Sequence, residues 1–257
     1  MIDSRAIIHP DARVSEDASI GPFTVIGADV EIDSGCWLGP HVVINGPTRI
    51  GKNNRIYQFC SIGDDPQDKK YQGEKESILE IGEGNVIREY CSINRGTGLG
   101  GGVTRIGNRN WIMAYVHIAH DCIVGNENVF ANNTTLAGHV VIEDFVILGG
   151  FTGVHQFCRI GKNSFSAISS IIVKDVPPFL MMSGNTAKPT GLNKEGLKRH
   201  GFGNKTIKNL KQAYRTIYRE GLLLQDALSK LQDLVDECEE VAGFCRFIED
   251  SERGIAR

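Results

Sequence analysis

Residues 20–51 read IGPFTVIGADVEIDSGCWLGPHVVINGPTRIG, and a large aliphatic residue returns at every sixth position of this stretch. The same period holds from residue 8 to residue 62 without a break, and it resumes over residues 81–93. It then runs through residues 106–172, where Ser166 is the only polar residue at that position. An internal repeat of this length identifies a repetitive architecture before any single motif is considered.

The residue two positions before each large aliphatic one is usually small. Five of the seven cysteines fall on that position: Cys36, Cys60, Cys91, Cys122 and Cys158. We therefore predict that these cysteines are small buried core residues. An odd number of cysteines with no C-x-x-C spacing indicates neither a disulfide framework nor a zinc knuckle.

A period of six with one large and one small apolar residue resembles the hexapeptide repeat of left-handed parallel β-helices. The resemblance implies one short strand and one turn per hexad, with three hexads in each triangular coil. We expect about eight coils stacked at ~4.8 Å each. Two interruptions, at about 64–80 and 98–105, are predicted to be loops that leave the prism, the second short and flexible because of its glycines.

The period changes after Pro177 and Pro178. Apolar residues at helical spacing predict a helix over about 204–220 and further helices near 228–235 and 241–248. The predicted fold class is thus an all-β left-handed parallel β-helix over residues 1–189, followed by a small α-helical C-terminal domain over 190–257.

Composition and charge restrict the possible functions. The net charge of −3 argues against a surface that binds nucleic acid throughout. Residues 188–220 nevertheless hold nine Lys or Arg and only two Glu, so they could dock an acidic partner or simply form a solvated helix face. The absence of an N-terminal signal pattern and of any long apolar run leads us to expect a cytoplasmic protein that does not span a membrane.

The β-helix implies 18 residues in each coil, so residues 18 positions apart should lie next to each other on adjacent coils. His120, Gly138 and Gln156 would form one column, with His117, His139 and His155 beside it. One histidine next to Asp121 could act as a general base, since its ordinary pKa is near neutrality. Alternatively, His117, His120 and His139 could bind zinc, as in hydrolytic hexapeptide-repeat proteins that are trimers.

A set of motifs, in order along the chain, makes a resemblance specific. They are Ile56-Tyr57-Gln58-Phe59, Gln67-Asp68-Lys69-Lys70-Tyr71, Ile87-Arg88-Glu89, Asn94-Arg95-Gly96-Thr97, His117-Ile118-Ala119-His120-Asp121, Leu136-Ala137-Gly138-His139-Val140, His155-Gln156-Phe157 and Gly196-Leu197-Lys198-Arg199. Together they are similar to those of the UDP-N-acetylglucosamine 3-O-acyltransferases, a hexapeptide-repeat acyltransferase family that begins lipid A biosynthesis.

The resemblance implies that a 3-hydroxyacyl chain passes from acyl carrier protein to the 3-position of UDP-N-acetylglucosamine, without cofactor or metal. His120 would be the general base, Asp121 would orient it, and the Gly138 N–H would stabilise the oxyanion. The implied assembly is a homotrimer with sites between protomers. The basic segment would then bind the acidic acyl carrier protein.

The resemblance also implies which residues bind the substrates. The sugar and acyl sites would be lined by His117, His139, His155 and Gln156, and by Asp68 and Lys70 from a neighbouring subunit. The uridine diphosphate end would be held by Asn193, Glu195 and Arg199, with His200 in place of a second arginine and hence a weaker grip on phosphate. Ile168 replaces a glycine of relatives that take longer acyl chains, so we predict a shorter donor.

Asn94 stands where many relatives have histidine. This substitution leaves open a second function among acyltransferases, the N-acylation of a 3-amino UDP-sugar analogue. The zinc hydrolase, and a structural β-solenoid without an active site, are the alternatives from other classes.

Overall fold

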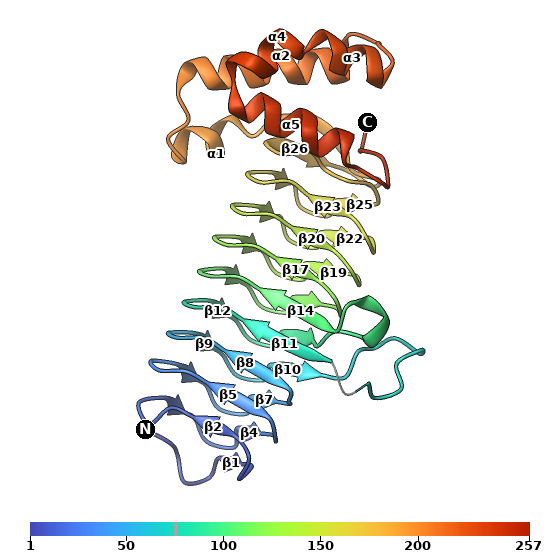
Figure 1. The fold of residues 1–257 in the computed structure, drawn as a ribbon. Coiled ribbons are helices and arrows are strands. Elements are labelled where there is room, and N and C mark those ends of the chain that lie inside the picture. Colours follow the sequence, from blue (N-terminus) through green and yellow to red (C-terminus); the bar gives the residue numbers. More distant parts are fainter. Residues whose placement is uncertain (75–76) are drawn as a thin grey trace.

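The computed structural model describes residues 1–74 and 77–257, and its strands form three parallel sheets around a triangular prism (Figure 1). The first sheet contains β1 (Ile7–Ile8), β4 (Val25–Ile26), β7 (Val43–Ile44), β10 (Ser61–Asp64), β13 (Ser92–Asn94), β16 (His117–Ile118), β19 (Thr135–Leu136), β22 (Gly153–Val154) and β25 (Ile171–Ile172). The second contains β2 (Arg13–Val14), β5 (Val30–Ile32), β8 (Thr48–Ile50), β11 (Ile78–Ile81), β14 (Val103–Ile106), β17 (Ile123–Val124), β20 (Val141–Ile142) and β23 (Arg159–Ile160).

The third sheet ends in a hairpin near the helices. It contains β3 (Ser19–Ile20), β6 (Trp37–Leu38), β9 (Arg55–Ile56), β12 (Val86–Ile87), β15 (Trp111–Ile112), β18 (Val129–Phe130), β21 (Ile147–Leu148), β24 (Phe165–Ser166), β26 (Leu180–Ser183) and β27 (Lys188–Leu192). All pairs are parallel except β26 with β27. From β1 to β26, consecutive strands along the chain therefore belong to different sheets, as one strand per hexad requires.

The predicted register holds outside the two loops. Ile26 pairs with Ile44, and Ile142 pairs with Ile160, each 18 positions apart. The repeated apolar side chains point inward and are buried from Ile20 onward, as are all five cysteines of the small position, whereas Ile8 and Val14 in the first coil are half-buried. Ser166 is buried as well, but its hydroxyl is 2.8 Å from Thr152 Oγ1 and accepts the Gly149 N–H at 3.1 Å. Its polar group is thus satisfied inside the prism.

A buried asparagine ladder fixes one inner corner of the prism. Asn85 Nδ2 donates to Asn54 Oδ1 at 3.0 Å, and Asn110 Nδ2 donates to Asn85 Oδ1 at 2.9 Å. Asn110 Oδ1 in turn accepts the Asn128 N–H at 2.9 Å. Because each amide bridges two coils, the ladder holds neighbouring coils in register.

Loop one is shorter than expected and loop two lies three residues earlier, because strand pairing resumes earlier in both places. β11 begins at Ile78 and β14 begins at Val103, and these two strands pair with each other. Loop one is therefore residues 65–77, of which Lys75 and Glu76 lie outside the described residues. Loop two is residues 95–102, and a 3₁₀ turn at Gly98–Gly100 gives it a defined conformation.

Five helices cover the C-terminal end of the prism (Figure 1). They are α1 (Lys194–Arg199), α2 (Asn204–Arg219), α3 (Leu224–Lys230), α4 (Gln232–Glu237) and α5 (Glu239–Glu249). The expected helices near 204–220 and 241–248 correspond to α2 and α5. The pattern near 228–235 is divided at Leu231, which is the C-cap of α3 and precedes α4. None of the helices in the described residues is long and apolar enough to cross a bilayer.

Candidate active site

One outer corner of the prism, where the chain turns from the first sheet to the second, brings the predicted column together. His120 and Asp121 follow β16, Gly138 and His139 follow β19, and Gln156 follows β22. A Cβ added to Gly138 would lie 2.6 Å from His120 Cε1 and 2.8 Å from His120 Nε2. Gly138 therefore lies directly on the imidazole, as the 18-residue register predicts. We call the corner formed by residues 120–121, 138–139 and 156–157 the catalytic corner.

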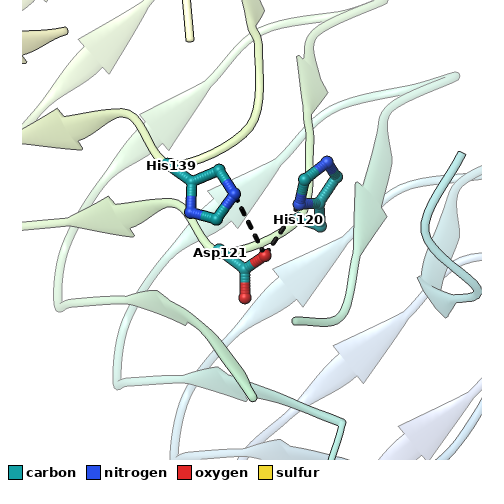
Figure 2. Close-up of side chains that lie close together, drawn as sticks. All are labelled: His120, Asp121 and His139. Atoms are coloured by element: carbon teal, nitrogen blue, oxygen red, sulfur yellow. Dashed lines mark hydrogen bonds and ion pairs between the residues drawn. The ribbon is translucent and has the colours of Figure 1, made fainter. Parts of the chain in front are cut away.

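His120 is oriented by a buried carboxylate. Its Nδ1 lies 2.7 Å from Asp121 Oδ2, and the Asp121 side chain is only 1% exposed (Figure 2). The same carboxylate oxygen is 3.7 Å from His139 Nε2. A hydrogen bond from Nδ1–H to a buried carboxylate leaves the lone pair on Nε2, the nitrogen that lies under Gly138.

Loop two holds Asp121 in place, which the sequence did not indicate. Thr97 donates its N–H to Asp121 Oδ1 at 2.8 Å and its hydroxyl to Oδ2 at 2.7 Å. A Cβ at Gly100 would collide with the Asp121 carboxylate, so the loop packs closely against it. The loop is thus an ordered support and not the flexible connection expected from its glycines. The only sequence signal was the Asn94–Thr97 motif itself, which gave no role to Thr97.

Two histidines near His120 favour their neutral forms. Burial lowers the pKa of His117 from its usual 6.5, and the neighbouring His120 lowers it further. His117 Nδ1 lies 2.7 Å from Ser92 Oγ. Burial is also the main cause that lowers the pKa of His139, although the Asp121 carboxylate opposes this effect. Both rings can therefore form hydrogen bonds with a polar substrate without carrying charge.

A cavity of about 730 Å³ opens in front of the catalytic corner. Its lining includes Gln67, Asp68, Lys70, Tyr71, His117, His120, Gly138, His139, Gln156 and Phe157. Asp68 and Lys70 thus face His120 of the same chain. The expectation that they reach across from a neighbouring subunit stays a prediction; within one chain, loop one returns over its own catalytic corner.

Asn94 and Arg95 anchor loop one beside that cavity. Asn94 is buried and donates its amide to the Asp65 carbonyl at 2.8 Å. Arg95 donates to the Gly63 carbonyl at 2.8 Å and to the Tyr71 hydroxyl at 3.2 Å, and it pairs with Asp65. Asn94 is absent from the residues that line the cavity. The amide in place of an imidazole is thus a loop anchor in this chain.

The residues assigned to the uridine diphosphate end lie at another corner, between the second and third sheets. Asn193 caps α1 by accepting the Gly196 N–H at 3.1 Å, and its amide donates to the Asn163 carbonyl at 3.0 Å. His200 Nδ1 bonds Asn163 Oδ1, and its ring lies 4.7 Å from that of Phe145. None of Asn193, Glu195, Arg199 and His200 lines the cavity at His120, nor do His155 and Ile168.

The side chains that could hold a metal differ from the predicted set. Among the described residues, His120, Asp121 and His139 offer ligand atoms within 4.8 Å of one another. His117 is not part of this group, and its Nδ1 is engaged by Ser92. The His120 nitrogen nearest the group already faces Asp121, so metal binding would have to replace that hydrogen bond.

Comparisons with known proteins cover the whole chain. Residues 175–256 match the family described as UDP-N-acetylglucosamine O-acyltransferase, domain 2, and residues 103–138 match the bacterial transferase hexapeptide of six repeats. An acyl-[acyl-carrier-protein]–UDP-N-acetylglucosamine O-acyltransferase of Thiobacillus denitrificans is 53% identical over 256 residues, covering 100% of this chain and 99% of the relative. The one from Alkalilimnicola ehrlichii is 56% identical over 256 residues, with coverages of 100% and 99%.

A solved structure shows the same architecture. The UDP-N-acetylglucosamine O-acyltransferase of Moraxella catarrhalis is 49% identical, with a TM-score of 0.96 and coverage of 100% of this chain and 99% of that one. The predicted fold class, a left-handed parallel β-helix of hexapeptide repeats followed by a small helical domain, is thereby confirmed.

Proposed function

The chain belongs to the UDP-N-acetylglucosamine O-acyltransferase family, and from this premise we propose how its residues carry out acyl transfer. It is an acyltransferase that moves an acyl chain from acyl carrier protein to UDP-N-acetylglucosamine, the first step of lipid A biosynthesis. In our proposal the donor is a 3-hydroxyacyl thioester and the acceptor is the sugar 3-hydroxyl. One observation supports this most directly: His120 is held by buried Asp121, and its free nitrogen lies beneath Gly138.

His120 is the general base. With Nδ1–H donated to Asp121, Nε2 accepts the proton of the 3-hydroxyl as its oxygen attacks the thioester carbonyl. Asp121 fixes the tautomer and stabilises the imidazolium that forms. Thr97 holds both carboxylate oxygens, so Asp121 cannot turn away during the reaction.

Gly138 stabilises the oxyanion. Its carbonyl accepts the Phe157 N–H at 3.1 Å, whereas its own N–H has no acceptor among the described residues. A free N–H next to the base suits a tetrahedral intermediate, whose negative oxygen needs a donor in place. When the intermediate collapses, the carbon–sulfur bond breaks and His120 returns its proton to the thiolate. The products are the ester and the free thiol of the carrier protein.

The remaining cavity residues bind the substrates. Neutral His117 and His139 and the amide of Gln156 give hydrogen bonds to the sugar, and Asp68 and Lys70 close the cavity from loop one. His155 lies next to Gln156, at the edge of this group of residues. Ile168 is 69% exposed at the corner between the third and first sheets, where we propose that it limits acyl length from the neighbouring protomer.

The assembly we propose is a homotrimer. Asn193, Glu195, Arg199 and His200 lie at a different corner from His120, so a single chain does not bring the nucleotide residues to its own cavity. A neighbour that presents this corner to the cavity would complete the site.

We also propose the partner surface and the cellular location. Residues 1–189 would form the catalytic β-helix, and residues 190–257 the helical domain on which acyl carrier protein docks. Five basic residues recur at intervals of three or four positions along α2: Lys205, Lys208, Lys211, Arg215 and Arg219. They complement the acidic carrier protein. The reaction would take place in the cytoplasm.

The test of the base is His120→Ala in steady-state acyl transfer. We expect kcat to fall by roughly 10²- to 10⁴-fold, the usual contribution of a positioned general base. The exposed His9 provides the matched control, and His9→Ala should retain full activity. Near wild-type turnover by His120→Ala would refute the assignment.

Two further measurements separate the other readings. Mass spectrometry of the products from 3-hydroxy and 3-amino UDP-sugars, with a panel of acyl donors, gives the attacking atom and the acyl length. Stoichiometric zinc in the purified protein, with activity lost on chelation, would indicate a hydrolytic site at His120, Asp121 and His139 instead.

A further inference from the structure

The C-terminal tail, residues 250–256, returns to the prism on the edge that carries the two loops (Figure 1). Asp175 forms a parallel bridge with Ile255, and the Ala256 N–H donates to the Asp175 carbonyl at 2.8 Å. Ser251 Oγ donates to Asp175 Oδ2 at 2.7 Å. Buried Asp175 therefore fastens the tail to the last coil at the level just above Gln156 and Phe157.

The tail occupies the position that the last residues of a full 18-residue coil would occupy. Ile142 pairs with Ile160, 18 positions later, but Ile160 bridges Val176, only 16 positions later, so the last coil is two residues short. At the two coils below, the second residue of the corner turn donates its N–H to the turn beneath: His139 to the His120 carbonyl, and Phe157 to the Gly138 carbonyl, both at 3.1 Å. Asp175, the next residue in this series, donates instead to the Gly254 carbonyl at 3.2 Å.

Arg253 is the tail residue that reaches His155, which directly precedes Gln156 of the catalytic corner. Its Nη2 lies 3.3 Å from His155 Nδ1 and 3.4 Å from the Val173 carbonyl oxygen. Its Nε is buried and has no partner among the described residues. The same His155 Nδ1 lies 3.1 Å from the Gln156 carbonyl oxygen, so the guanidinium packs against the turn that contains Gln156.

His155 belongs to the turn that lies on Gly138. The Cys158 N–H donates to the His155 carbonyl at 3.3 Å, and between them Phe157 binds the Gly138 carbonyl. Phe157 also stacks on His139 with the ring centroids 4.4 Å apart, and it lines both the reaction cavity and a second cavity of about 510 Å³ that Arg253 borders. A movement of this turn would shift the peptide of Gly138 and the ring of His139 together.

We propose that Arg253 is a positioning residue for acyl transfer. Through its contact with His155, it keeps the turn with Gln156 and Phe157 in place above Gly138, and the tail thereby completes the active-site wall that the short last coil leaves open. The inference rests on the proposed roles of His120 and Gly138. Arg253 touches no reacting atom in this account, so its effect passes through His155.

The test compares Arg253→Gln and Arg253→Lys with wild type in steady-state assays with acyl carrier protein thioester and UDP-N-acetylglucosamine. We expect kcat of Arg253→Gln to fall about tenfold, since small misplacements near a reacting group are costly, with each KM within about twofold of wild type. Lysine keeps a cationic donor at this position that can bind the Val173 carbonyl, so Arg253→Lys should recover part of the loss. Arg257, which donates to the Leu222 carbonyl in the same tail, is the control, and Arg257→Gln should behave as wild type.

A double-mutant cycle distinguishes positioning from general support of the fold. In the His155→Gln background, Arg253→Gln should cause little further loss, because the partner through which it acts is already gone. A wild-type kcat for Arg253→Gln, or a full additional loss in the His155→Gln background, would overturn the inference. If either occurred while His120→Ala was inactive, the inference would fail and the proposed function would stand.

Discussion

Two outer corners of the prism share a backbone and differ in chemistry. The catalytic corner has Asp121, His139 and Phe157 at the second turn position of successive coils, with φ of 58°, 61° and 64°. The corner between the third and first sheets, which we call the aromatic corner, has Phe23, His41, Phe59, Tyr90 and Tyr115 at the same position, with φ from 56° to 64°. The left-handed conformation of these residues is therefore a property of the coil and not a sign of function.

The aromatic corner shows what a histidine does there without a carboxylate. His41 is stacked between Phe23 and Phe59, with ring centroids 5.1 and 5.3 Å apart. His139 stacks on Phe157 in the same manner, but it also meets the edge of the His120 ring at 5.2 Å and lies 3.7 Å from Asp121. The buried carboxylate, and not the histidine itself, makes one corner a candidate for catalysis.

The largest effect in this comparison is expected at the first turn position, where the catalytic corner has Gly138 and the aromatic corner has Ala114. In Gly138→Ala the new methyl group would press on the His120 ring, so His120 or the Gly138 peptide must move. We expect kcat to fall by roughly 10²- to 10³-fold, comparable to the loss of an oxyanion donor. Ala114→Gly makes the reverse change at the other corner and should alter kcat less than about twofold. Equal effects of the two variants in the acyl-transfer assay would contradict the assignment of the oxyanion site.

An intermediate effect is expected from replacing each stacked histidine by phenylalanine. His139→Phe keeps the stack on Phe157 and removes only the polar edge toward Asp121, so Tm should change little while kcat/KM falls by roughly tenfold, the value of about one hydrogen bond to substrate. His41→Phe should leave both quantities near wild type. If His41→Phe lowered kcat/KM as much as His139→Phe, the polar edge of His139 toward Asp121 would not explain the difference between the corners.

The smallest effect concerns the pH dependence of stability. The pKa of His117 is lowered in the folded protein, chiefly by burial, so below about pH 6.5 the unfolded chain binds more protons and the folded state loses stability as the pH falls. We expect Tm to fall between pH 7.5 and 5.5, and to fall less in His117→Gln. His139 retains its own share of the effect in that variant.

Thermal unfolding at one fixed protein concentration measures this difference, because assembly also affects Tm. His9→Gln, which replaces an exposed histidine, is the control and should keep the wild-type slope. A slope in His117→Gln as steep as in wild type would show that the burial of His117 does not account for it.

The sequence predicted more of the fold than of the site. The hexad period gave the coils, the buried aliphatic positions and the buried cysteines, since a repeat places each residue by its position alone. It also placed Gly138 on His120. It could not assign Thr97 to Asp121, because a seven-residue insertion separates the two coils and its path is not part of the repeat. It likewise did not indicate that Asn94 and Arg95 hold loop one over its own corner, where Asp68 and Lys70 line the cavity.

The sequence by itself thus determined the prism, its register and the column of His120, Gly138 and Gln156. The tertiary structure decided how loop two holds the Asp121 carboxylate, and how the tail reaches His155 from 98 positions away. The physical reason is the range of the interactions. The burial of every sixth side chain follows the repeat, so it can be predicted from the residue's position in the hexad alone. The hydrogen bonds that fix polar groups form only after loops and termini have returned to the prism.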